Sequence, residues 1–138
     1  MNNLDMALKF GQVLLPEGLV EANIGVKDGA IVTIAKDPAL PPAKKVIEAE
    51  GLIIIPGLID AHVHLRDPGH PEKEDFTSGT MAAAAGGVTT VLEHPVSVPS
   101  VHSVETLASK YAICNEKAVI DFGLYGGAGT TSIKEIGP

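Results

Sequence analysis

Two histidines separated by one residue, His62 and His64, are the residues of this chain whose type and spacing point most directly to chemistry. In an extended strand alternate side chains point to the same face, so both imidazoles are expected on one side and Val63 on the other, in packing. Imidazoles so close together can share one metal ion, and a hydrolytic metal site needs such ligands together with an open position for water. The pair is therefore a candidate for part of a metal site.

The surrounding residues favour a metal site over the other interpretation, which is two ordinary polar residues at a strand end. Residues 53–59 form a run rich in isoleucine, as in a parallel strand buried on both faces, although Pro56-Gly57 interrupts it. The chain then enters a polar loop within a few residues of the strand end. In a barrel of parallel strands, the carboxyl ends of the strands are where active sites are built.

Strands and helices alternate in the pattern from residue 52 onward, which predicts parallel βαβ units. Before that point the chain reads as strands, with a hairpin at Asp28-Gly29 because glycine reaches positive φ easily. Gly86-Gly87 predicts the end of a helix, and Ser103 is the type of residue that caps the start of one. The expected elements are strands over 6–15, 21–27, 30–35, 46–49, 88–92 and 118–125, a helix over 74–85, and a helix after Ser103 with Val104, Leu107, Ala108 and Tyr111 on one apolar face.

The segment 56–69, with its Asp-Ala-His-Val-His-Leu-Arg-Asp-Pro-Gly ending, resembles the metal-binding signature of the cyclic amidohydrolases. This is the branch that contains dihydroorotase, allantoinase and hydantoinase. The resemblance extends to three further segments: 51–57 is similar to the entry into their barrel, 73–90 to the helix and strand that follow, and 121–127 to a later barrel strand.

This resemblance implies an α/β fold, the amino-terminal part of a metal-dependent-hydrolase (β/α)8 TIM barrel. Residues 1–55 are then expected to be strands of a small composite β-sandwich, and residues 56–138 the first strands and helices of the barrel. A complete barrel takes roughly 250 residues, and the chain has 138. We therefore expect an amino-terminal fragment of a longer enzyme.

The resemblance also implies the chemistry. The full-length enzyme is expected to hydrolyse a cyclic amide, at a carbon–nitrogen bond other than a peptide bond, by a metal-bound hydroxide. His62 and His64 would bind zinc, in a binuclear site completed by residues from later barrel strands, and Arg66 and His94 would bind substrate. No catalytic residue is matched within the chain, and two ligands make a weak site. The chain by itself is therefore expected to be inactive.

The substrate assignment is divided between two segments. Arg66, in His-Leu-Arg-Asp-Pro-Gly, resembles the dihydroorotase arginine that holds a substrate carboxylate. The Glu93-His94-Pro95-Val96 stretch is closer to allantoinase, since valine cannot contact that carboxylate. A dihydroorotase-like reaction is the main interpretation; an allantoinase or hydantoinase substrate, or a catalytically silent scaffold, is the alternative. Asp60 could accept a hydrogen bond from an imidazole N–H or be a carboxylate near the metals, or it could be a buried polar residue with a structural partner.

The resemblance implies a small cyclic amide or ureide as the partner, and composition argues against two other classes of partner. The net charge of −7 and the scattered lysines offer no basic patch for nucleic acid, and no apolar run reaches the ~20 residues of a membrane span. A cytoplasmic, homo-oligomeric enzyme of pyrimidine or purine metabolism is expected. The single cysteine, Cys114, is interpreted as a small buried helix residue without a catalytic role.

Overall fold

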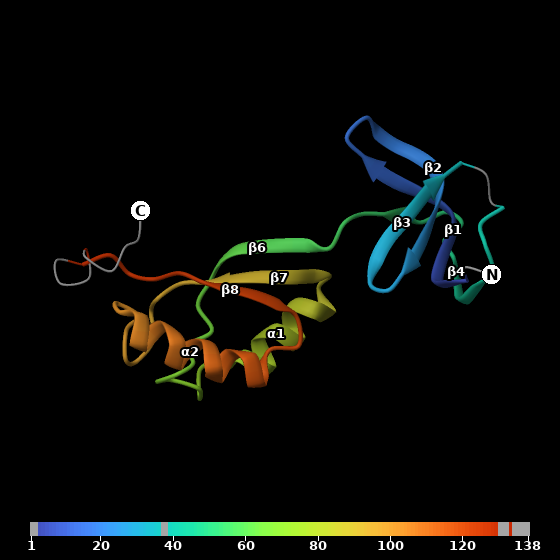
Figure 1. Cartoon of the computed structure of the whole chain (residues 1–138). Coiled ribbons are helices and arrows are strands. Elements are labelled where there is room, and N and C mark those ends of the chain that lie inside the picture. Colours follow the sequence, from blue (N-terminus) through green and yellow to red (C-terminus); the bar gives the residue numbers. More distant parts are fainter. Residues whose placement is uncertain (1–2, 37–38, 130–132, 134–138) are drawn as a thin grey trace. The chain divides into compact units, whose positions relative to one another are not determined.

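The computed structural model describes residues 3–36, 39–129 and 133. The chain divides into two compact units, Met1–Pro56 and Gly57–Pro138, which are followed from blue to red in Figure 1. Each unit has a sheet of its own, and each is described by itself below.

The first unit is a five-stranded sheet in the order β3-β2-β1-β4, with β5 also paired to β1. Its hairpin between β2 and β3 turns through Asp28 and Gly29, both at positive φ (49° and 75°), as the sequence predicted. Its core is formed by Val13, Ala22 and Ile24. The strands are β1 (Leu4–Leu15), β2 (Gly18–Lys27), β3 (Ala30–Ala35), β4 (Ala43–Glu48) and β5 (Ile53–Ile54).

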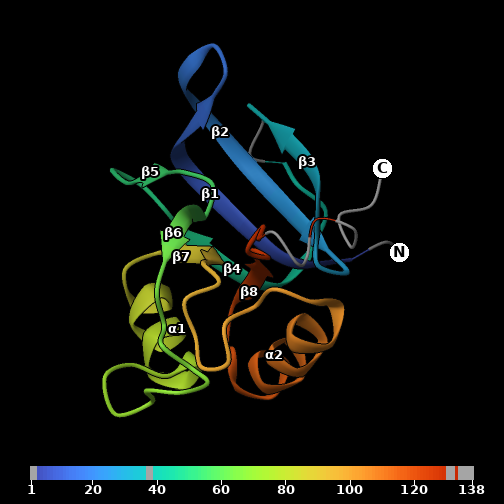
Figure 2. The ribbon, with the colours of Figure 1, turned by 90° about the vertical axis from the view of Figure 1, so that its left-hand side faces the viewer.

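The second unit alternates strands and helices, which confirms the predicted parallel βαβ pattern. Its strands pair in parallel in the order β6-β7-β8, and both helices lie against the same face of this sheet (Figures 1 and 2). The elements are β6 (Leu58–Val63), α1 (Phe76–Ala85), β7 (Val88–Glu93), α2 (Val104–Lys117) and β8 (Asp121–Leu124).

Apolar packing between the helices and the sheet forms the core of this unit. The buried residues of this core are Leu65, Phe76, Val91 and Cys114, and the partly buried Val63 packs against them as expected. Ser103 caps α2 by accepting a hydrogen bond from the Thr106 N–H (3.2 Å), and the hydroxyl of Thr106 accepts one in return from the Ser103 N–H. Gly86 ends α1. Both glycine and cap predictions are confirmed.

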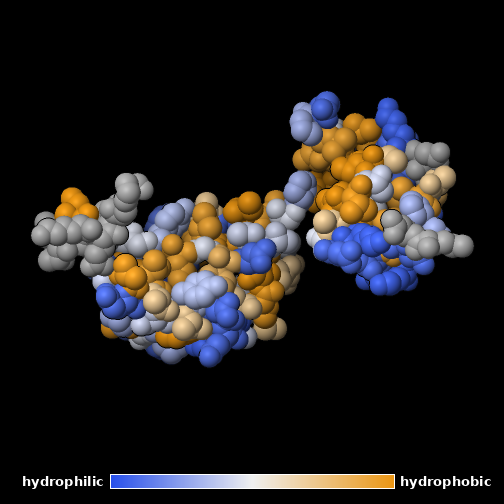
Figure 3. All heavy atoms as spheres, in the orientation of Figure 1, coloured by the Kyte–Doolittle hydropathy of each residue, from blue (hydrophilic) through white to orange (hydrophobic). Residues whose placement is uncertain are grey.

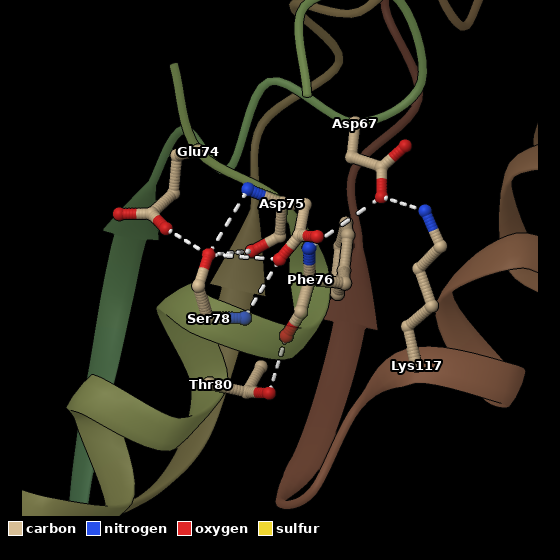
Figure 4. A network of polar contacts seen from close by, with 7 residues as sticks. All are labelled: Asp67, Glu74, Asp75, Phe76, Ser78, Thr80 and Lys117. Carbon is tan, nitrogen blue, oxygen red and sulfur yellow. Dashed lines mark hydrogen bonds and ion pairs between the residues drawn. The ribbon is translucent and has the colours of Figure 1, made fainter. Parts of the chain in front are cut away.

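The start of α1 differs from the prediction. The helix was expected from residue 74, but it begins at Phe76. Asp75 is the N-cap instead and accepts a hydrogen bond from the Ser78 N–H (2.7 Å) (Figure 4). The Ser78 bonds hold the pKa of the Asp75 carboxyl below its usual range. Capping, more than charge within the turn, stabilises this end.

The apolar face expected on α2 is not its buried face. Val104 and Tyr111 are 61% and 54% exposed. Lys110 and Cys114 are buried instead (2% and 0% exposed), and Lys117 is on the same face three residues further on. The prediction failed because it treated lysine as a surface residue, whereas Lys110 and Lys117 have carboxylate partners beneath the helix.

The run 53–59 is also less buried than predicted. Pro56-Gly57 splits it, and β5 pairs with β1 in the first unit. Leu58 and Ile59 in β6 are 48% and 66% exposed, because β6 is an edge strand that pairs only with β7 within the described part of the chain. Apolar side chains are visible on the surface of both units in Figure 3.

Removing the cap of α2 should destabilise the protein. Ser103→Ala deletes the acceptor for the Thr106 N–H, and loss of such a cap lowers the free energy of unfolding by about 1 kcal/mol. Urea unfolding followed by circular dichroism measures the effect. Ser109→Ala is the control, since this exposed hydroxyl bonds only the Glu105 carbonyl within the helix. Equal stability of the two variants would contradict the capping assignment.

The thiol of Cys114 should be inert in the folded protein. Burial raises its pKa to about 12, and the thiolate is the form that reacts. A chromogenic disulfide reagent at neutral pH should therefore modify urea-unfolded protein quickly and folded protein very slowly. Rapid modification in native buffer would show that α2 does not seal the core.

Candidate functional site

The carboxyl ends of three neighbouring strands form the candidate site. Val63, Glu93 and Leu124 are in register across β6, β7 and β8. The residues that follow them are His64, His94 and Tyr125. Their backbones continue the ladder, since the His94 N–H donates to the Val63 carbonyl (3.0 Å) and the Tyr125 N–H to the Glu93 carbonyl (2.9 Å). Parallel register alone thus gathers these side chains at one edge of the sheet.

The structure brings His62 and His64 together. Their Nε2 atoms are 3.2 Å apart, with ring centroids 5.1 Å apart. The other ring nitrogen of His64, Nδ1, is buried and has no hydrogen-bond partner among the described residues. Two imidazole nitrogens facing each other at this distance need either one shared proton or one shared cation.

The nitrogen pair fits a zinc ion. Two nitrogens bound to one tetrahedral zinc, at about 2.0–2.1 Å each, lie roughly 3.3–3.4 Å apart, close to the 3.2 Å between His62 and His64. Within the described ranges, no group of three or more His, Cys, Asp or Glu side chains could hold a metal ion. The chain therefore presents two suitable ligands side by side.

His94 lies directly against this pair. Its ring stacks on that of His62, with centroids 3.8 Å apart, and lies 5.3 Å from that of His64. Burial, followed by the neighbouring histidines, lowers the pKa of the His94 imidazole. Tyr125, whose ring centroid is 4.8 Å from that of His94, was not singled out from the sequence. Its place as the last residue of the predicted strand 118–125 was the signal available.

Arg66 lies in the loop after β6, with its backbone in the left-handed region (φ 57°). A non-glycine residue held there costs of order 1 kcal/mol and persists only where its surroundings fix it. The side chain is half-buried, and it takes part in none of the ion pairs between described residues. Val96, the residue that favours allantoinase over dihydroorotase in the sequence, is 48% exposed.

Asp60 and the two remaining histidines, His70 and His102, make other contacts. Asp60 is exposed and accepts a hydrogen bond from the His62 backbone N–H (3.1 Å), so it is not the buried structural residue of the second interpretation, and its role near the metal stays a prediction. His70 pairs with Glu72 at the surface. His102 is exposed and contacts the Gly127 carbonyl through Nδ1 (3.1 Å).

A fully buried carboxylate, Glu93, lies beneath the histidines and was missed from the sequence. One of its oxygens accepts the Leu65 N–H (2.9 Å) and the other pairs with the Lys110 ammonium (3.0 Å). Lys110 also donates to the His94 carbonyl (3.2 Å). The signal was a glutamate at the end of an otherwise apolar strand, which has to find partners if it is buried.

A second buried carboxylate, Asp67, supports the loop on the other side of Arg66. Its Oδ2 accepts a hydrogen bond from the Lys117 ammonium at 2.6 Å and from the Phe76 N–H at 3.5 Å (Figure 4). The bond to Asp67 raises the pKa of the Lys117 ammonium. This network joins the loop to the start of α1 and the end of α2.

Comparisons of the sequence and of the structure with known proteins point to the same family. Residues 53–135 match the Amidohydrolase family. Allantoinase from Bacillus licheniformis is 42% identical over 129 residues, which cover 91% of this chain and 28% of the relative. Dihydroorotase from Methanothermobacter thermautotrophicus is 49% identical over 105 residues, 76% of this chain and 24% of the relative.

Among solved structures, L-hydantoinase (dihydropyrimidinase) from Arthrobacter aurescens superposes with a TM-score of 0.92 at 31% identity. The match covers 96% of this chain and 30% of that one. A D-hydantoinase structure gives a TM-score of 0.80 at 30% identity, over 96% of this chain and 30% of its own. The chain thus spans less than a third of the length of these relatives.

Proposed function

The chain belongs to the amidohydrolase family, and from this premise we propose that its complete protein hydrolyses a cyclic amide, with metal ligands and substrate contacts supplied by the residues described here. The predicted fold class, the start of a TIM-barrel hydrolase preceded by sandwich strands, is confirmed by the hydantoinase structure. The observation that carries the proposal is the 3.2 Å approach of the His62 and His64 Nε2 atoms at the carboxyl edge of the sheet.

In this proposal His62 and His64 hold zinc, in a site that becomes binuclear with ligands from other parts of the complete protein. A zinc ion supplies a Lewis acid that polarises the ring carbonyl and lowers the pKa of water. His94 binds substrate beside it: burial lowers the pKa of its imidazole, which favours the neutral form that can accept one hydrogen bond and donate another.

Arg66 orients the substrate by gripping a carboxylate or ureide oxygen with parallel N–H donors. A dihydroorotase-like substrate, a ring that carries a carboxylate, is the main proposal. An allantoinase or hydantoinase substrate is the alternative, which Val96 and the allantoinase relatives favour. The resemblance also supports a cytoplasmic homo-oligomer of pyrimidine or purine metabolism. As a separate finding, no helix among residues 3–36, 39–129 and 133 is long and apolar enough to cross a membrane.

Loss of either histidine of the pair should remove the metal. His62→Ala and His64→Ala in the full-length protein are expected to lower bound zinc, measured by elemental analysis, and to abolish hydrolysis of cyclic amides. His70→Ala, which removes a surface histidine, is the control and should retain both. Unchanged zinc content in the pair variants would refute the ligand assignment, and an inactive, metal-free wild type would favour the scaffold alternative.

The role of Arg66 can be tested by substrate charge. Arg66→Met should raise KM for a ring that carries a carboxylate by roughly 10- to 100-fold, because a hydrogen bond to a charged group is worth about 1.5–3 kcal/mol. KM for an uncharged hydantoin should change little. Steady-state kinetics on both substrates measures the difference. Equal losses on the two rings would show that Arg66 does not read the carboxylate.

A further inference from the structure

Two lysines on one face of helix α2 pair with carboxylates of the site. Lys110 and Lys117 are seven residues apart, two helical turns, so their side chains leave the same side of the helix. Each pairs with a carboxylate whose side chain is at most 5% exposed: Lys110 with Glu93 and Lys117 with Asp67. The two carboxylates belong to different parts of the site, the end of β7 and the loop after β6.

The Glu93–Lys110 pair contacts the backbone next to two histidines. Glu93 immediately precedes His94 and accepts the N–H of Leu65, the residue after His64. Lys110 binds the His94 carbonyl directly. The strand ends that carry His64 and His94 are therefore fixed to one buried carboxylate and one buried ammonium. Neither charge can be left alone there without a large desolvation penalty.

The Asp67–Lys117 pair helps to fix Arg66, whose two chain neighbours are both held by hydrogen bonds. Arg66 is flanked by Leu65, held by Glu93, and by Asp67, held by Lys117 and by the start of α1. Its own carbonyl accepts the His70 N–H (2.8 Å). These bonds hold the left-handed backbone of Arg66, and so they set the direction from which its side chain leaves the loop.

We propose that α2 positions two separate parts of the site through its two lysines. This inference rests on the proposed function of the histidines and Arg66. Lys110, through Glu93, sets the geometry of the histidines for the metal. Lys117, through Asp67, sets the position of Arg66 for the substrate. Both lysines are positioning residues, since each acts on the site through the carboxylate with which it pairs.

The test compares Lys110→Met and Lys117→Met in the full-length protein. Lys44→Met is the matched control, because Lys44 also pairs with an aspartate, Asp5, but at the surface of the first unit. Three properties are measured for each: zinc affinity by competition with a chelator, the absorption spectrum of the cobalt-substituted protein, and kcat and KM for a cyclic amide that carries a carboxylate.

Lys110→Met is expected to weaken zinc binding roughly 10- to 100-fold, the usual effect of losing a partner behind metal ligands, and to alter the cobalt spectrum. Lys117→Met is expected to leave zinc affinity and the spectrum unchanged while raising KM by about 10-fold or more. The control should match wild type. If both variants only lose stability, with zinc affinity, spectrum and KM as in wild type, the pairs are purely structural and the proposal is wrong.

A second set of variants covers the case in which Lys110→Met does not fold. Glu93→Gln combined with Lys110→Met keeps an oxygen acceptor for the Leu65 N–H and leaves no buried charge unpaired; it should recover zinc affinity relative to Lys110→Met or, if that variant is unfolded, fold and bind zinc. Lys117→Arg keeps a cation beside Asp67 and should restore KM. Absence of either recovery contradicts the proposal.

Failure of the proposed function gives a different result. If wild-type protein binds no zinc and hydrolyses no cyclic amide, nitrogen-correlated NMR of the imidazoles still tests the positioning. The signals of His62, His64 and His94 should move in Lys110→Met and stay in place in Lys117→Met. Signals unmoved in both would overturn the inference independently of any activity.

Discussion

The buried carboxylate of Glu93 is the interaction on which the candidate site depends. Glu93 ends the middle strand of the sheet and is fully inaccessible to solvent, so its charge must be satisfied inside the protein. The Leu65 N–H and the Lys110 ammonium satisfy it. These partners come from the loop after β6 and from α2. The carboxylate therefore ties the end of β7 to both of these segments. His64, His94 and Tyr125 are the residues that come directly after the paired strand ends.

Much of this arrangement was predictable because its causes are local in sequence. The Asp28-Gly29 hairpin follows from the ease of positive φ at glycine, and the Ser103 cap from the hydrogen-bonding needs of a helix start. The alternation of strands and helices predicts parallel pairing, which brings strand ends together. The approach of His62 to His64 requires only the two-residue period of a strand and was therefore foreseeable.

The remaining features depend on contacts between distant segments. Lys110 is 17 residues from Glu93 and Lys117 is 50 residues from Asp67, and nothing in the local pattern of α2 shows that these lysines replace apolar residues on its buried face. Tyr125 reaches His94 through the register of β7 and β8, which a single sequence does not state. The exposure of Ile59 follows from its place on an edge strand, not from its own side chain.

The two carboxylate–lysine pairs differ in solvent exposure, and this difference divides the site. Glu93 and Lys110 are both sealed from water, whereas the Lys117 side chain is 37% exposed. Exposed pairs are weaker and are screened by salt, while buried ones are not. The histidine end of the site is thus held by a pair that is sealed from water, and the loop of Arg66 by a pair that water reaches on the lysine side. Under the proposed function, the metal site then has the support that salt reaches least, and Arg66, which reads the ring, has the support that salt weakens more.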